Sequence, residues 1–228
     1  MGIGRVGIIG GGQMGGGVAE LTAKAGLATV VREVSPEAAE RSAAGIRKSL
    51  DRALERGKLD EAAHASALGN VSFTTEMADL ADCDLVVEAV VESYELKAGI
   101  FRELDEVVTS PDAVLATNTS SIPIIDIAMN TSRPERVIGL HFFNPVQLMR
   151  LVEVVRTDET DDDVYATARS FGEAVGKTPV SCVDTPGFVV NRLLVPYMVQ
   201  ALEMLDRGDA SKEDIDVAMQ LGCGHPMG

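Results

Sequence analysis

Short apolar runs alternate with helically spaced segments along most of the chain. The run at 5–9 predicts a buried strand, and Met14, Val18 and Leu21 then follow at the four- and three-residue spacing of a helix. Alternation of this kind predicts an α/β fold in which helices cover both faces of a mostly parallel sheet. Further strands are predicted at 27–32, 71–73, 85–89, 114–117, 137–140, 151–155 and 180–183, and further helices at about 36–56, 94–108 and 163–175.

The pattern changes after residue 183. Residues 184–187, Asp-Thr-Pro-Gly, form a cluster that breaks regular structure, and the segments beyond it, 188–207 and 211–221, have helical spacing only. We therefore expect an α/β domain at 1–184 and the start of an all-α C-terminal domain at 185–228. A piece this small cannot bury a core of its own, so we expect it to pack on the first domain, to pair with another chain or to be a fragment.

Composition excludes several classes of partner. The chain carries 35 acidic and 20 basic residues, a formal charge of −15, which repels phosphate backbones and anionic lipid. We expect no nucleic-acid and no membrane partner. Neither a membrane-spanning run nor an export signal is visible, so a cytoplasmic location is expected. The three cysteines are scattered, which argues against a disulfide framework and against a metal site.

A glycine-rich turn links the first strand to the first helix. Its glycines at the first, third and sixth positions allow a tight turn, close approach of a pyrophosphate and close helix–strand packing. The helix that follows presents free N–H groups to the phosphates. This pattern predicts a dinucleotide site in a Rossmann-type domain. The turn residues expected to bind the cofactor are Gly10, Gly12, Gln13, Met14 and Gly15.

Glu33 ends the second strand at about the spacing expected of an acid that binds the adenine ribose. A carboxylate there repels a 2′-phosphate, which favours NAD over NADP. The neighbouring Arg32 could accommodate such a phosphate. Because successive side chains of a strand point in opposite directions, the two cannot face the ribose equally, and NAD is expected.

Candidate catalytic residues follow the later strands. Ser120 and His141 each come just past a predicted strand, and Glu153 lies on the next one. Ligands bind at the carboxyl ends of strands in open parallel sheets. A histidine with a carboxylate partner can act as a general base, and a nearby serine can stabilise a substrate oxygen. From spacing alone, a histidine beside two phenylalanines is more often a core residue, so both interpretations stay open.

Five segments together form a distinctive set. They are the glycine turn with its methionine, Asn-Thr-Ser-Ser at 118–121, His-Phe-Phe-Asn-Pro at 141–145, Leu-Val-Glu-Val-Val at 151–155, and Asp-Thr-Pro-Gly-Phe-Val-Val-Asn-Arg at 184–192. This set resembles the 3-hydroxyacyl-CoA dehydrogenases, in particular the short bacterial 3-hydroxybutyryl-CoA dehydrogenases, and the resemblance covers essentially the whole chain. It implies NAD-dependent oxidation of a (3S)-3-hydroxyacyl-CoA, short-chain as in 3-hydroxybutyryl-CoA, to the 3-oxoacyl-CoA, as in β-oxidation.

The resemblance also implies roles by position. His141 corresponds to the base that takes the 3-hydroxyl proton, and Glu153 to the acid that orients it and balances its charge. Ser120 and Asn191 correspond to groups that position the substrate oxygen and thioester. The implied cofactor contacts are Glu92, Lys97 and Asn144, and the implied coenzyme A contacts are Ser49, Arg56 and Ser120.

Some positions depart from the family pattern. Glu33 replaces an aspartate, Arg56 a lysine and Gln147 a frequent proline. Family members continue beyond Pro-Met-Gly at 226–228 with helices that form most of the dimer interface, so a homodimer is expected if the helices present suffice. Two alternatives stay open. One is a dehydrogenase for a small 3-hydroxy acid without coenzyme A, and the other is an NAD-binding remnant, or a structural family member, without turnover.

Overall fold

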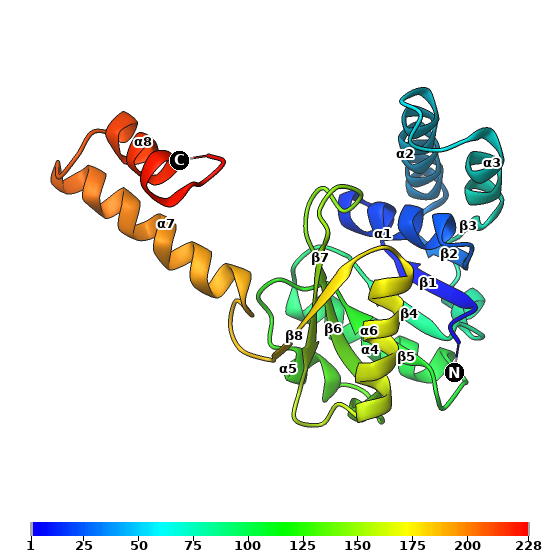
Figure 1. Cartoon of the computed structure of the whole chain (residues 1–228). Coiled ribbons are helices and arrows are strands. Elements are labelled where there is room, and N and C mark those ends of the chain that lie inside the picture. The colour runs from blue at the N-terminus through cyan, green and yellow to red at the C-terminus, as the bar shows by residue number, and fades with distance from the viewer. Residues whose placement is uncertain (1, 228) are drawn as a thin grey trace. The chain divides into compact units, whose positions relative to one another are not determined.

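The computed structural model describes residues 2–227 and divides into two compact units, Met1–Pro186 and Gly187–Gly228 (Figure 1). The first unit is built on an eight-stranded sheet of order β3-β2-β1-β4-β5-β6-β7-β8. Neighbouring strands are parallel except for the antiparallel pair β6–β7. This confirms the expected mostly parallel α/β fold. The strands are β1 (Arg5–Ile9), β2 (Ala28–Arg32), β3 (Val71–Thr74), β4 (Leu85–Glu88), β5 (Val114–Thr117), β6 (Val137–Phe142), β7 (Leu151–Arg156) and β8 (Thr178–Val183).

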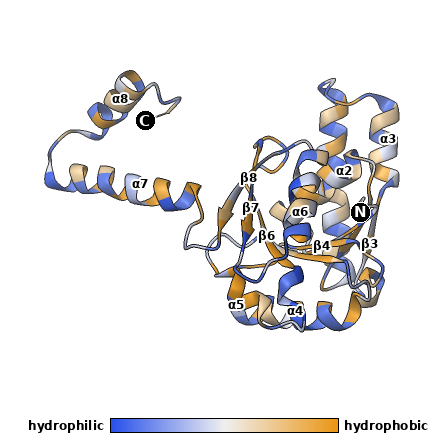
Figure 2. Ribbon diagram, turned by 60° about the horizontal axis from the view of Figure 1, so that its bottom comes forward, coloured by the Kyte–Doolittle hydropathy of each residue, from blue (hydrophilic) through white to orange (hydrophobic). Residues whose placement is uncertain are grey.

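Helices cover both faces of this sheet. Figure 2 shows α4 and α5 on one side of the strands and α2, α3 and α6 on the other. α1 packs against β1 and β2 and against the α2–α3 pair. The helices of this unit are α1 (Gln13–Lys24), α2 (Pro36–Glu55), α3 (Glu61–Gly69), α4 (Tyr94–Val107), α5 (Ile124–Ala128) and α6 (Asp162–Ala174), with short 3₁₀ turns η1 (Met77–Leu80) and η2 (Pro134–Arg136).

The central strands are buried on both faces. Every residue of β4, β5 and β6 is buried, which explains why these segments are apolar without alternation. Glu88, Thr117 and His141 are the polar exceptions: Glu88 and Thr117 are the last residues of β4 and β5, and His141 is the last but one of β6. Buried polar groups therefore gather at the carboxyl edge of the sheet, where a ligand would bind.

α2 begins where its sequence predicts, at Pro36. The Ser35 hydroxyl accepts a hydrogen bond from the Ala38 amide at 3.2 Å, and Pro36 is the first helical residue. The buried residues of this helix recur every four positions, at Ala38, Ser42, Ile46 and Leu50. This stripe turns one hydroxyl, that of Ser42, toward the domain.

One sequence expectation about β6 is wrong. β6 extends to Phe142, so His141 lies inside the strand and not just past its end. The cause is the antiparallel pairing of β6 with β7, in which His141 stands opposite Glu153. The connection at 143–150 contains no helix and is too short for a parallel crossover.

The second unit consists of α7 (Val190–Arg207) and α8 (Lys212–Cys223). α7 ends at Gly208, whose φ of 74° is the left-handed conformation that glycine favours at this position. The Ser211 hydroxyl caps α8 by accepting from the Asp214 amide at 3.1 Å. Neither helix contains a buried residue. Within residues 2–227, no helix is both long and apolar enough to cross a bilayer.

Candidate functional site

The glycine turn between β1 and α1 has the geometry of an anion site. Gly10 has a φ of +85°, and a Cβ on Gly15 would lie 1.8 Å from the Gly10 carbonyl oxygen, so neither position accepts a side chain. No described atom lies within 4 Å of a Cβ built on Gly12. α1 starts at Gly12 without a side-chain cap and without an acid in its first turn. The helix N-terminus is therefore open to a phosphate, as a bound dinucleotide requires.

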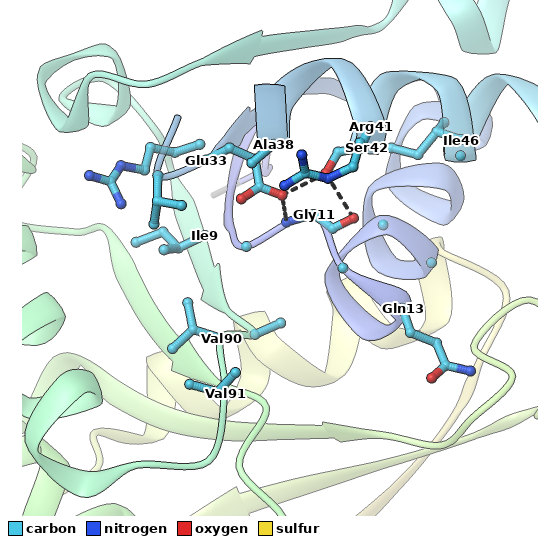
Figure 3. Close-up of a pocket in the computed structure, with 18 of the residues that line it drawn as sticks. Ile9, Gly11, Gln13, Glu33, Ala38, Arg41, Ser42, Ile46, Val90 and Val91 are labelled. Atoms are coloured by element: carbon cyan, nitrogen blue, oxygen red, sulfur yellow. Dashed lines mark hydrogen bonds between the residues drawn. The ribbon is translucent and has the colours of Figure 1, made fainter. Parts of the chain in front are cut away.

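A cavity of about 1130 Å³ lies over this turn (Figure 3). Its walls come from the turn itself, the end of β2, the buried face of α2, the segment after β4 and the loop at 144–147. The volume is ample for an extended cofactor. Of the residues predicted from the sequence, Gly10, Gly12, Gln13, Glu33, Ser49 and Asn144 line it.

Glu33 reaches this cavity from the end of β2. Its Oε1 accepts from the Gly11 amide at 2.8 Å and from the Ser42 hydroxyl at 2.5 Å, as the dashed lines of Figure 3 show. Neither bond uses Oε2, which remains able to accept from a ribose hydroxyl. Arg32 also lines the cavity, but its Nε donates to the Thr75 carbonyl at 3.2 Å. Ser42 was not predicted, although its place in the four-residue stripe of α2 was a readable signal.

His141 and Glu153 form a buried pair across the β6–β7 ladder. His141 Nδ1 lies 2.7 Å from Glu153 Oε2, and the two residues are 6% and 0% exposed. A carboxylate at Nδ1 keeps the proton on that nitrogen and makes Nε2 the nitrogen that can take up another. The Phe143 ring lies against the imidazole, with 4.6 Å between ring centroids. A general base with an orienting acid requires a carboxylate held against one ring nitrogen in this way.

Ser120 lies in the loop after β5, which wraps around the carboxylate of Glu92. Glu92 Oε1 accepts from the Thr119 hydroxyl at 2.5 Å and from the amides of Ser120 and Ser121 at 3.0 and 3.2 Å. Burial alone raises the pKa of the Glu92 carboxyl, but the hydrogen bonds that it accepts and the Lys97 charge outweigh burial and lower it to about 2. Glu92 therefore stays ionised at any pH at which the protein would work.

Lys97 is buried, which rules out an ordinary surface lysine. It is 1% exposed, and its Nζ lies 2.7 Å from Glu88 Oε1 and 3.4 Å from Glu92 Oε2. Neither Glu92 nor Lys97 lines the large cavity described above. Their direct contact with a cofactor stays a prediction.

Comparison with known proteins identifies the family. Residues 5–185 match the description "3-hydroxyacyl-CoA dehydrogenase, NAD binding domain", and residues 187–228 match the C-terminal domain of the same family. The chain belongs to the 3-hydroxyacyl-CoA dehydrogenases. It is accordingly an NAD-dependent oxidoreductase, and the glycine turn with the cavity above it fits that cofactor.

Individual relatives of this dehydrogenase are similar over nearly all of the chain. The 3-hydroxybutyryl-CoA dehydrogenase of Mycobacterium tuberculosis is 51% identical over 98% of this chain and 79% of the relative. A probable 3-hydroxybutyryl-CoA dehydrogenase of Deinococcus radiodurans is 46% identical over 98% and 80%. The crystal structure of (S)-3-hydroxybutyryl-CoA dehydrogenase PaaH1 from Ralstonia eutropha superposes with a TM-score of 0.97 at 43% identity, covering 100% of this chain and 80% of that one.

The remaining predicted residues of the dehydrogenase lie in separate places. Met14 is half-buried in the first turn of α1. Ser49 faces the cavity from α2, whereas Arg56 is exposed at the end of that helix. Asn191 lies in the first turn of α7, in the second unit. In residues 2–227, no group of three or more His, Cys, Asp or Glu side chains is arranged to hold a metal ion.

The loop that carries Asn144 is held at several points. Asn118 Oδ1 accepts from the Phe142 amide at 2.8 Å, just before the loop begins. Lys177 donates to the carbonyl oxygens of Val146 and Met149 at 2.5 and 2.7 Å. Burial and the nearby Lys24 charge lower the pKa of this lysine. The wall of the cavity around Asn144 is therefore fixed by the domain beneath it.

Proposed function

We propose that this dehydrogenase oxidises a short (3S)-3-hydroxyacyl-CoA, such as 3-hydroxybutyryl-CoA, to the 3-oxoacyl-CoA, with NAD as the cofactor. The observation that carries the mechanism is the buried His141–Glu153 pair, with 2.7 Å between Nδ1 and Oε2. The names of the relatives support the four-carbon substrate, since those at about 50% identity are 3-hydroxybutyryl-CoA dehydrogenases.

In this proposal the side chains divide the work between proton transfer and binding. His141 takes the proton of the 3-hydroxyl on Nε2, while Glu153 holds the proton on Nδ1 and balances the positive charge that forms on the ring. Ser120 and Asn191 hydrogen-bond the substrate oxygen and the thioester. NAD, when bound, supplies the acceptor for the hydride that leaves the same carbon.

Binding of the two nucleotides is proposed for different parts of the first unit. The cofactor pyrophosphate binds the turn of Gly10, Gly12 and Gly15, and Glu33 binds the adenine ribose through Oε2. We assign the nicotinamide end to Asn144, and coenzyme A to Ser49 and Arg56 on α2. Gln13, Met14, Glu92 and Lys97 complete the proposed cofactor contacts.

A homodimer is also proposed, with α7 and α8 in its interface. Both helices expose large apolar side chains, including Leu193, Leu202 and Leu221, which are 70%, 64% and 83% exposed. Apolar surface of this extent is typical of an interaction site. Light scattering on a size-exclusion column tests the proposal, and a monomer at micromolar concentration would contradict it.

The activity is tested by following the loss of NADH absorbance with acetoacetyl-CoA. Turnover with the thioester and not with free acetoacetate supports the proposed substrate class. Turnover with the free acid would instead support a dehydrogenase that acts without coenzyme A. Tight NADH binding without turnover of either compound would indicate a binding remnant.

His141→Gln tests the proposed base. Because the base acts in the chemical step, we expect turnover to fall by about 100-fold or more while NADH binding is retained. His64→Gln is the matched control, since His64 pairs with Asp51 on the α2–α3 hairpin at 2.7 Å. Retained turnover in His141→Gln would remove His141 from this role.

A further inference from the structure

A chain of buried charges runs from the sheet to the loop that carries Ser120. Glu88 is the last residue of β4 and is fully buried, and Lys97, in the first turn of α4, is 1% exposed. The chain continues through Glu92 to the loop at 119–121. We propose that Glu88 and Lys97 are positioning residues that act through Glu92 to hold Ser120 in place for the reaction. The proposal rests on the role of Ser120 in the proposed function.

Several donors of the loop at 119–121 converge on one oxygen of Glu92. Glu92 Oε1 accepts from the Thr119 hydroxyl and from two consecutive backbone amides, those of Ser120 and Ser121. The Ser121 hydroxyl adds a further bond at 3.0 Å. Two consecutive amides that point at one atom fix the backbone of Ser120, so the direction of its side chain depends on where that oxygen sits.

Lys97 determines where the Glu92 carboxylate sits. Its ammonium lies 3.4 Å from Glu92 Oε2, the oxygen that the loop does not use. A buried ammonium is stable only with anionic or carbonyl partners, and Lys97 has carboxylates on two sides. The same charge that neutralises Glu88 therefore restrains Glu92 from the side opposite the loop.

Glu88 fixes Lys97 to the sheet. Its Oε1 accepts from Lys97 Nζ and from the Val90 amide, both at 2.7 Å, and its Oε2 accepts from the Thr117 hydroxyl at 2.7 Å. Thr117 ends β5, and its hydroxyl in turn accepts from the Thr119 amide at 3.2 Å. The Glu88 carboxylate is thus tied to β5, to the segment after β4 and to Lys97 of α4, and Thr117 is tied to the loop, so the network transmits the geometry of the sheet to Ser120.

A role for Glu92 limited to cofactor contact would not produce this arrangement. A cofactor contact needs one outward-facing oxygen, whereas here five donors of the loop, the Ser120 hydroxyl at 3.5 Å among them, use Oε1 and a buried lysine lies beside Oε2. The two roles also differ in what they predict. Loss of a cofactor contact weakens NADH binding, whereas loss of positioning weakens only those steps in which Ser120 takes part.

A double-mutant cycle separates these roles. Glu92→Gln keeps the shape and one acceptor but loses the charge. We expect kcat/KM for acetoacetyl-CoA to fall about tenfold at saturating NADH, a condition that compensates for any lost cofactor contact. In a Ser120→Ala background, Glu92→Gln should cause no further loss under the same condition. An equal loss in both backgrounds, or a loss that saturating NADH restores, would overturn the proposal. Glu106→Gln is the matched control, because Glu106 is an exposed acid on the same helix, α4.

The contribution of the buried pair is tested by Glu88→Gln/Lys97→Met, which removes both charges and leaves neither one buried alone. Amide hydrogen exchange at Ser120 and Ser121 should accelerate about tenfold in this variant and in Glu92→Gln, with exchange in β1 unchanged. Unchanged exchange at these two amides would refute the proposal. Exchange does not depend on turnover, so an inactive wild-type protein would refute the proposed function while this measurement still decided the positioning.

Discussion

The Ser42 hydroxyl, on α2, hydrogen-bonds the Glu33 carboxylate that we assign to the adenine ribose, and Ser42→Ala removes this bond. The hydroxyl lies 2.5 Å from Glu33 Oε1, and Ser42 is 8% exposed. A hydrogen bond to a charged acceptor contributes about 1.5–3 kcal/mol. Glu33 is only half-buried and keeps the Gly11 amide at 2.8 Å, so water replaces part of the loss. We expect a net loss of about 1 kcal/mol, which raises the KM for NADH about fivefold.

Because Ser42 lies away from the proposed base, kcat should stay within about twofold of the wild type. The assay is steady-state oxidation of NADH at saturating acetoacetyl-CoA, repeated with NADPH. A loosened Glu33 repels a 2′-phosphate less well, so the preference for NADH should narrow. Ser72→Ala is the control, since it removes a hydroxyl bond to the Thr29 carbonyl at 3.2 Å outside the cavity. A folded Ser42→Ala protein with unchanged KM and unchanged preference would refute the reasoning.

Three further predictions follow from the same contacts. Glu153→Gln keeps the shape of the buried pair but not its charge, so kcat should fall about 100-fold while the affinity for NADH is retained. An unchanged kcat would contradict the proposal that Glu153 balances the charge of His141. Gly15→Ala places a Cβ 1.8 Å from the Gly10 oxygen and should lower the free energy of unfolding, measured by denaturant titration, by about 1–3 kcal/mol. Gly12→Ala, whose Cβ meets no described atom within 4 Å, should keep the free energy of unfolding and weaken NADH binding, measured by fluorescence. Equal free energies of unfolding for the two variants would contradict this explanation of the turn. The lowered pKa of Glu92, about 2 against an ordinary 4.5, stabilises the fold above pH 4.5, and this contribution is lost as pH falls from 4.5 toward 2. Since the Glu92 side chain is 37% exposed, this contribution to the free energy of unfolding is about 1 kcal/mol. Glu92→Gln should therefore unfold at a lower denaturant concentration than wild type at pH 7 but not at pH 2. A difference that persists at pH 2 would contradict this assignment of the pKa.

The fold was predictable where one physical rule dominates. Strands buried on both faces are uniformly apolar, so β1 and β5 were located to the residue. The start of α2 at residue 36 was also predicted, and the Ser35 hydroxyl caps it. The antiparallel pairing of β6 with β7 was not predicted, because buried strands have the same uniformly apolar sequence whether they pair in parallel or antiparallel. The length of the connection at 143–150, too short for a crossover helix, was the available signal.

The candidate site divides in the same way. The glycine turn and Glu33 are local features, and the structure brings them to one cavity. The pairing of His141 with Glu153 needed only the β6–β7 register, but sequence spacing alone favoured a core histidine. Glu88 carried no local signal, since one acid at the end of an apolar run is ordinary. Its function depends on contacts with Lys97 and Thr117 across two elements, which no single segment encodes.

Gln147, which replaces a proline frequent in the family, makes a hydrogen bond that proline could not make. A proline at this position would offer no donor. The Gln147 amide donates at 2.9 Å to Glu20, an acid that is 2% exposed in α1 and whose nearest cation, Lys24, is 3.6 Å away. A carboxylate so buried needs each of its partners. Because Gln147 and Glu20 both line the cavity near Asn144, this bond joins the loop to α1 beside the proposed nicotinamide end. The departure from proline therefore adds a contact between the loop and α1, and a proline at position 147 would remove it.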